Sequence, residues 1–231
     1  MQINQIGVVI ADDMEFLPLK RCLQQRGVPQ TTGQAWGCEL VSFRWDGAQV
    51  TAVQCGIGKA NAAAAAAFLI AGGAQVLLNI GLSGAVAPLR RGQLVLGETY
   101  LETDFDVTPL GYPPYRKPGQ AGPYRADEAL LAAFCTRFSL QKGLLGSGDF
   151  FLTDPAKKQR YLDELSVLAF DMESGAIAAV CDKCGVPFLS LRQISDGADG
   201  ESKEEYREFN DRAEQTLAQT LLEGISHLLV Q

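Results

Sequence analysis

A chain of 231 residues, of which 47% are apolar, is long enough to bury a substantial core within one domain. Its formal net charge of −7 and its lack of a basic cluster argue against nucleic acid as a main partner, because phosphate backbones are bound by concentrated basic faces. The sequence shows neither a leader pattern nor an apolar run long enough to cross a bilayer, which predicts a cytoplasmic protein without a membrane partner.

The histidine and cysteine content narrows the possible chemistry. The single histidine, His227, lies in the last predicted helix, so histidine-based nucleophilic catalysis and histidine-ligated metals are not expected. The six cysteines lack the spacing of a disulfide framework and are interpreted as reduced, mostly buried thiols. Cys181 and Cys184 are closely spaced, but no second pair completes a zinc site, so a structural role is favoured for both. Neither a metal nor an organic cofactor is implied.

Strands and helices alternate from the start of the chain. Residues 6–11 predict an apolar strand, and residues 16–23 place apolar side chains at helical spacing. Between them, Asp12, Asp13 and Glu15 crowd the turn. A helix N-terminus is stabilised by one or two acids, which accounts for part of this cluster, whereas Glu15 could instead point over the edge of the sheet.

A hairpin and a glycine-rich turn follow. Residues 38–45 and 49–55 predict two strands joined by Asp46-Gly47, a dipeptide typical of tight hairpins. The second strand ends in Gly56-Ile57-Gly58-Lys59, before an alanine-rich helix over residues 61–70. This turn lacks the spacing of a phosphate-binding loop, so a nucleoside triphosphate is not the expected ligand.

The remaining elements continue the alternation. The predicted strand 75–80 opens into a glycine-rich stretch at 81–85, where a ligand could approach the backbone. The loop 102–124 contains five prolines and is long enough to be functional or flexible. The other predicted elements are strands at 93–101, 143–149, 166–170 and 187–191, helices at 127–138 and 171–184, a short helix capped by Asp154-Pro155, and a helix over 203–230 that starts with a Ser202/Glu205 capping box.

This alternation predicts one α/β domain over residues 1–231, a three-layer αβα sandwich around a central mixed sheet. Ligands of such folds bind at the carboxyl ends of strands. Asp196 lies at one such end and has two interpretations: a carboxylate that caps the next loop, or an acid whose pKa is raised by burial. Other strand ends carry Glu15, the glycines near Ser83, Met172-Glu173, and Arg192 with Ser195.

Six stretches of the sequence carry recognisable motifs in a characteristic order: residues 11–15, 56–59, 104–112, 147–151, 171–178 and 192–199. Together they resemble the 5′-methylthioadenosine/S-adenosylhomocysteine nucleosidases of the nucleoside phosphorylase superfamily. The resemblance covers essentially the whole chain, and Met172-Glu173 and Ser195-Asp196 are its more specific motifs. It implies a nucleoside phosphorylase-like fold, a homodimer and a role in methionine salvage.

The resemblance also implies an activity and roles for named residues. The activity is hydrolysis of the N-ribosidic bond of a purine nucleoside, 5′-methylthioadenosine or S-adenosylhomocysteine, to adenine and a thioribose. Asp196 would protonate the purine N7 with Ser195 orienting it, and Glu15 would deprotonate the attacking water with help from Arg192. Glu173 would bind the ribose hydroxyls, with Met172 packed under the sugar. Phe151 and Leu152 would contact the base, and Ile57, Tyr206 and the region around Phe105 would contact the 5′ substituent. Ser83 is a further implied substrate-binding residue.

Three features qualify these expectations: the position of Arg192, the residues at the phosphate-binding positions of a phosphorylase, and two departures from the nucleosidase pattern. Because Asp196 must hold a proton, Arg192 is expected to face Glu15 and the water rather than Asp196. Asn79 and Leu82 occupy positions where a phosphorylase would bind phosphate with arginine and serine, which favours hydrolysis over phosphorolysis. One departure is Leu82, which stands where the nucleosidase family usually has serine. The other is Asp12, which stands where the family commonly has methionine, and a carboxylate there suits a polar or cationic 5′ group. The alternatives are a phosphorylase, a futalosine-type nucleosidase and a non-catalytic nucleoside-binding protein.

Overall fold

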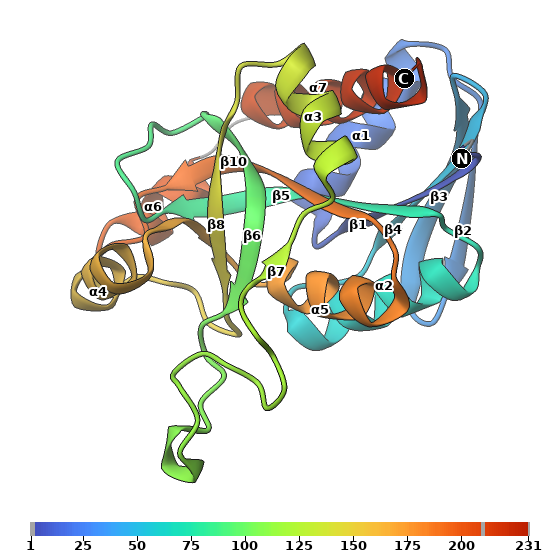
Figure 1. Cartoon of the computed structure of the whole chain (residues 1–231). Coiled ribbons are helices and arrows are strands. Elements are labelled where there is room, and N and C mark those ends of the chain that lie inside the picture. The colour runs from blue at the N-terminus through green and yellow to red at the C-terminus, as the bar shows by residue number, and fades with distance from the viewer. Residues whose placement is uncertain (1–2, 209–210, 231) are drawn as a thin grey trace.

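A ten-stranded mixed sheet forms the centre of the computed structural model, which describes residues 3–208 and 211–230 (Figure 1). Its strands are β1 (Gln5–Ile10), β2 (Gln30–Ala35), β3 (Cys38–Trp45), β4 (Ala48–Gln54), β5 (Val76–Ala85), β6 (Leu94–Glu102), β7 (Tyr124–Arg125), β8 (Gln141–Ser147), β9 (Val167–Asp171) and β10 (Phe188–Asp196). They lie in the order β10-β6-β8-β9-β5-β1-β4-β3-β2, with β7 beside β6. Because β10 also pairs with β5, the strands β5, β10, β6, β8 and β9 close into a ring.

Helices cover both faces of this sheet (Figure 1). One layer contains α1 (Asp13–Gln25), α3 (Glu128–Arg137) and α7 (Asp211–Val230), and the other contains α2 (Lys59–Ala71) and α5 (Ser174–Cys184). The shorter helices are α4 (Pro155–Leu165), α6 (Ser202–Arg207) and the 3₁₀ turn η1 (Thr108–Leu110). This arrangement confirms the predicted three layers around a mixed sheet. Within the described ranges, none of the helices combines the length and the apolar character needed to cross a bilayer.

Local sequence explains where several elements begin and how they pack. Asp154 accepts a hydrogen bond from the first turn of α4 ahead of Pro155, which confirms the predicted cap, and Asp127, predicted as the start of a helix, caps α3 in the same way. The hairpin at Asp46-Gly47 is also confirmed, since both residues have positive φ between paired β3 and β4. The six cysteines are free thiols, as expected, and Cys184 is the exposed one.

Two strands are longer than the sequence predicts, and two strands, β2 and the two-residue β7, were missed. β5 continues to Ala85 and β10 to Asp196, so the glycine-rich stretch at 81–85 is part of a strand rather than beyond its end. The reason is parallel pairing between the two, with Arg192 opposite Gly81, which local sequence does not reveal. β2 was missed because its residues are mostly polar and exposed, so no apolar alternation marks them.

The prediction of a single helix over 203–230 was wrong. The structure has α6 and α7 as separate helices, and residues 209–210 of that prediction lie outside the described part of the chain. The capping box is not formed either. The Ser202 hydroxyl accepts a hydrogen bond from the Asp199 amide, and the Glu205 carboxylate accepts one from the Gly197 amide across 2.7 Å. Both side chains therefore hold the loop that follows β10.

Candidate functional site

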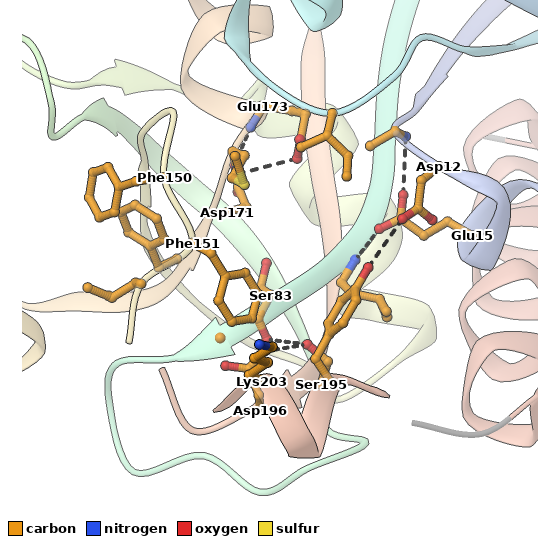
Figure 2. Close-up of a pocket in the computed structure, with 18 residues that line it drawn as sticks. Asp12, Glu15, Ser83, Phe150, Phe151, Asp171, Glu173, Ser195, Asp196 and Lys203 are labelled. Atoms are coloured by element: carbon orange, nitrogen blue, oxygen red, sulfur yellow. Dashed lines mark hydrogen bonds between the residues drawn. The ribbon is translucent and has the colours of Figure 1, made fainter. Parts of the chain in front are cut away.

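A cleft of about 460 Å³ lies at the carboxyl ends of β1, β5, β9 and β10 (Figure 2). Ten of the eleven site residues assigned from the sequence line it: Glu15, Ile57, Ser83, Phe151, Leu152, Met172, Glu173, Ser195, Asp196 and Tyr206. The eleventh, Arg192, is fully buried and does not line the cleft. Figure 2 shows Asp12 and Glu15 on one side of the cleft and Phe150 and Phe151 on the opposite side.

Asp196 is held at the end of β10 by two hydrogen bonds. Its Oδ2 accepts from the Ser195 hydroxyl across 2.7 Å, and its Oδ1 accepts from the Ala198 amide across 2.9 Å. Burial raises the pKa of Asp196 above its ordinary value, although both of these hydrogen bonds lower it. The two interpretations left open by the sequence are therefore compatible, because one oxygen caps the loop while the carboxyl group lines the cleft.

Glu15 lies across the cleft from this carboxyl and is 6% exposed. Its Oε1 accepts a hydrogen bond from the Leu82 amide across 2.7 Å, and its Oε2 accepts one from the Ala11 amide across 3.1 Å. Asp12 caps α1, so Glu15 is free to reach over the sheet toward β5. Burial raises the pKa of Glu15 to about 8, with the negative charges of Asp12 and Glu173 adding to the effect and Arg192 opposing it.

Glu173 forms a third buried carboxyl group in the cleft, where β9 leads into α5. Its Oε1 accepts a hydrogen bond from the Gly58 amide across 3.1 Å. Its Oε2 lies 3.6 Å from Nη1 of Arg192. Burial raises the pKa of Glu173 and the Arg192 charge opposes this shift. The carboxylate is thereby fixed between the first turn of α2 and a buried cation.

Arg192 has its own set of buried partners. Its Nε lies 3.4 Å from Oδ2 of Asp171 and donates to the Ser190 hydroxyl across 3.0 Å, and its Nη2 donates to Oδ1 of Asn79. Among the described residues, the ion pairs of Arg192 thus go to Asp171 and Glu173, and neither Asp196 nor Glu15 is within ion-pair distance. Arg192 thus does not pair with Asp196, and it acts on Glu15 through its charge rather than through an ion pair, because Asn79 and Asp171 hold the guanidinium inside the sheet.

Sequence reasoning overlooked the residues that orient this region. Asp171 accepts hydrogen bonds from the hydroxyls of Ser147 and Ser174, at 2.9 and 2.6 Å, and so fixes the turn that carries Met172-Glu173. Asn79 stands alone in an aliphatic strand, which was the available signal for its role. The lining residues that the sequence did not assign to the site are Ala11, Gly84, Phe150, Phe170, Asp171 and Lys203, whereas Asp12 and Leu82 were already identified there as departures from the family pattern.

Two hydroxyl groups of the lining, those of Tyr206 and Ser83, differ in their hydrogen bonding. The Tyr206 hydroxyl donates to Oδ2 of Asp12 across 3.2 Å, and the Tyr206 ring meets Phe151 edge-on at 5.7 Å between centroids. The Ser83 hydroxyl is buried and has no hydrogen-bond partner in the described part of the chain. A cleft with aromatic walls and several carboxyl groups can bind a flat heterocycle and transfer protons to and from it.

Comparisons with known proteins agree on one family. A family model described as the phosphorylase superfamily matches residues 5–226. The 5′-methylthioadenosine/S-adenosylhomocysteine nucleosidase of Geobacillus kaustophilus is 36% identical over 199 residues, which cover 82% of this chain and 85% of that protein.

Solved structures of similar shape come from Helicobacter pylori. A 5′-methylthioadenosine/S-adenosylhomocysteine nucleosidase, complexed with a pyrrolidin-3-ol that carries an amino-pyrrolopyrimidine group, has a TM-score of 0.91 at 25% identity and covers 98% of this chain and 99% of its own. A futalosine hydrolase has a TM-score of 0.90 at 26% identity and covers 97% and 98%.

Proposed function

We propose that the protein hydrolyses the N-ribosidic bond of a 5′-substituted adenine nucleoside. The products are adenine and the corresponding thioribose. The chain belongs to the phosphorylase superfamily and, within it, to the family of 5′-methylthioadenosine/S-adenosylhomocysteine nucleosidases. One observation carries the proposal: two buried carboxyl groups with raised pKa values, Asp196 and Glu15, line one cleft from different strand ends.

Asp196 acts on the leaving base. Cleavage of the bond leaves negative charge on the purine and oxocarbenium character on the ribose, so a proton delivered to N7 makes the base a better leaving group. The raised pKa of Asp196 keeps this proton available, and the Ser195 hydroxyl orients the carboxyl group. The base lies against Phe151, with the backbone of Leu152 along its edge, and both of these residues line the cleft.

Glu15 acts on the water. Once its carboxylate is ionised, it accepts a proton from a water molecule whose oxygen bonds to the anomeric carbon as the bond to the base breaks. The amides of Leu82 and Ala11 fix its two oxygens. Arg192 serves as a positioning residue, because its charge supports the ionised forms of Glu15 and Glu173 from inside the sheet.

The ribose and its 5′ group occupy the rest of the cleft. Glu173 accepts hydrogen bonds from the 2′- and 3′-hydroxyls, Met172 packs under the sugar, and the Ser83 hydroxyl is available for a polar atom of the substrate. Ile57 and Tyr206 line the remaining wall, where the 5′ substituent lies. The acidic lining favours water over phosphate, because the ionised carboxylates of the lining repel an anion.

The proposal also covers the domain organisation, oligomeric state, location and metabolic role of the enzyme. Residues 1–231 form one catalytic domain that acts as a cytoplasmic homodimer in methionine salvage. The match over residues 5–226 supports the single domain. Ile57 and Phe151 are about half exposed at the cleft, and this exposed apolar surface, which a second copy would cover, supports the dimer. Light scattering at assay concentration tests the dimer.

A futalosine-type nucleosidase is the second candidate. The futalosine hydrolase of Helicobacter pylori is as similar in shape to this chain as the nucleosidases are, and a polar 5′ side with Asp12 is compatible with a different substituent.

The test is an assay of the purified protein with 5′-methylthioadenosine, S-adenosylhomocysteine, inosine and futalosine, each with and without phosphate. Release of adenine and a free thioribose without phosphate is the expected result. Base release from futalosine alone would select the second candidate, and release that requires phosphate would contradict hydrolysis.

A further inference from the structure

We propose that Asp12 and Tyr206 form a subsite for a cationic 5′ substituent. Nucleosides with an ammonium group on the 5′ chain are then preferred over those with an apolar chain. This inference rests on the proposed hydrolysis and adds the substrate class.

The carboxylate of Asp12 has acceptor capacity that the protein leaves unused. Its Oδ1 accepts the capping hydrogen bond from the Met14 amide across 2.8 Å, and its Oδ2 accepts from the Tyr206 hydroxyl across 3.2 Å. A carboxylate has about four lone-pair sites, so each oxygen can accept one more hydrogen bond. Since Asp12 lines the cleft, that capacity is available to a ligand.

The charge around Asp12 is not balanced by the protein. The lining contains the carboxyl groups of Asp12, Glu15, Asp171, Glu173 and Asp196, and Lys203 is its one cation among the described residues. Arg192 is already paired with Asp171 and Glu173 inside the sheet. Within the described ranges Asp12 forms no ion pair, so a cation from the ligand would be its first.

The position of the pair relative to the rest of the cleft assigns it to the 5′ side. Asp12 lies across the cleft from Phe150 and Phe151 (Figure 2), and the base is placed against Phe151. Tyr206 connects the two sides, since its ring contacts Phe151 and its hydroxyl reaches Asp12. With the ribose hydroxyls on Glu173, the 5′ carbon is directed to the wall formed by Tyr206 and Asp12.

A second observation indicates that the cleft is prepared for polar ligand atoms. The Ser83 hydroxyl lines the same cleft, is 4% exposed and has no hydrogen-bond partner in the described part of the chain. A buried polar group without a partner is costly unless a ligand or water satisfies it. An apolar 5′ chain packed on Asp12 would add a second such cost, because it would strip water from a carboxylate without replacing its hydrogen bonds.

A bound ammonium group would also act on the reaction. The negative charge of Asp12 is one reason why the pKa of Glu15 is raised, and Glu15 must lose its proton to activate water. A cation on Asp12 offsets that charge, so a cationic substrate promotes the ionised form of Glu15. The preference is therefore expected in kcat as well as in KM.

The test compares three nucleosides that differ in the 5′ chain. S-adenosylhomocysteine carries an ammonium and a carboxylate, its decarboxylated analogue carries the ammonium alone, and 5′-methylthioadenosine carries neither. The expected kcat/KM of the wild type is at least about tenfold higher for both ammonium-bearing nucleosides than for 5′-methylthioadenosine, which corresponds to about 1.4 kcal/mol. In Asp12→Asn this ratio should fall about tenfold, while the cap of α1 is retained because asparagine caps as well as aspartate.

Asp13→Asn is the matched control. Asp13 is the next residue, is exposed, accepts a hydrogen bond from the Gln54 side chain and does not line the cleft, so its neutralisation should leave the ratio unchanged. A wild-type preference for 5′-methylthioadenosine, or an Asp12→Asn ratio within twofold of the wild type, would overturn the inference while leaving the hydrolysis intact.

A binding measurement separates this inference from the proposed function. If none of the nucleosides is hydrolysed without phosphate, the proposed function fails, but calorimetric titration with the decarboxylated analogue still tests the subsite. Its Kd should rise about tenfold in Asp12→Asn and stay constant in Asp13→Asn. Equal Kd values in the wild type and Asp12→Asn would contradict the subsite.

Discussion

The amide of Gly58 donates a hydrogen bond to Oε1 of Glu173 across 3.1 Å and so joins the first turn of α2 to the carboxyl group at the end of β9. Gly58 has φ +103°, a conformation that side chains disfavour. The next amide, that of Lys59, donates to Oδ1 of Asp149 across 2.8 Å. The glycine turn that superficially resembles a phosphate-binding loop thus presents its amides to carboxylates of the protein itself.

Replacement of Glu173 tests its assignment to the ribose hydroxyls. Glu173→Gln keeps the size of the side chain but removes the charge, so we expect kcat/KM to fall about 10²-fold through weaker charge-assisted hydrogen bonds. The loss should be much smaller for a 2′-deoxy analogue of the substrate, since the contact is already missing there. Steady-state kinetics on both substrates measure the difference. An equal loss on both would contradict the assignment.

Replacement of Ser195 should shift the alkaline side of the pH profile of kcat/KM. Its hydroxyl donates to Asp196 and lowers the pKa of that acid. In Ser195→Ala the pKa of Asp196 therefore rises, and because activity requires the protonated form, the alkaline fall of kcat/KM should shift to higher pH. Asp196→Asn should lower kcat about 10²- to 10⁴-fold. Ser42→Ala, which removes a hydroxyl bonded to Thr51 away from the cleft, is the control and should leave the profile unchanged.

Burial of Glu15 should make stability depend on pH. Its pKa is about 8 in the folded protein against an ordinary value of 4.5, so between these pH values the folded chain holds a proton that the unfolded chain has lost. This contribution to stability is complete below pH 4.5 and is lost as the pH rises toward 8.

The variant Glu15→Gln lacks that loss. As the pH rises across this window, the free energy of unfolding of the variant should increase relative to that of the wild type by at most about 1.4 kcal/mol per pH unit. Urea denaturation at several pH values between 5 and 9 measures the gain. Two curves that stay parallel over the whole range would contradict the raised pKa.

A methyl group at Gly81 should disturb the site from inside the sheet. A Cβ there would lie 2.2 Å from Nη1 of Arg192 and 2.9 Å from Oε1 of Glu15, and both side chains are too buried to move freely. Gly81→Ala is expected to destabilise the protein by about 1–3 kcal/mol, as overpacking does, and to reduce activity. Gly33→Ala is the matched control in β2, because a Cβ there meets nothing within 4 Å. Unchanged thermal stability of Gly81→Ala would contradict the close approach.

The elements that sequence alone predicts well are those with strong local signals. The apolar strand β1, the hairpin at Asp46-Gly47 and the aspartate caps of α3 and α4 follow from neighbouring residues. The extension of β10 to Asp196 does not, because it depends on pairing with β5, more than a hundred residues earlier. The closure of five strands into a ring is likewise a property of long-range pairing.

The same distinction applies to the site. Carboxyl groups at strand ends could be gathered into one cleft from sequence, because parallel strands end at the same edge of a sheet. The partners of Arg192 could not be predicted, because Asn79 and Asp171 are single polar residues on other strands and only the register brings them to the guanidinium. The bond from Tyr206 to Asp12 also depends on how α6 packs after β10.

The hydrogen bond between Asp12 and Tyr206 joins residues that are 194 positions apart in the chain. During synthesis, Asp12 leaves the ribosome long before Tyr206 is added, so the wall that they share is completed only after α6 has been synthesised. A nascent chain that stops short of α6 has Glu15, Glu173 and Asp196 but an open cleft. Nucleoside binding would therefore stabilise chains that include α6 more than chains that stop before it.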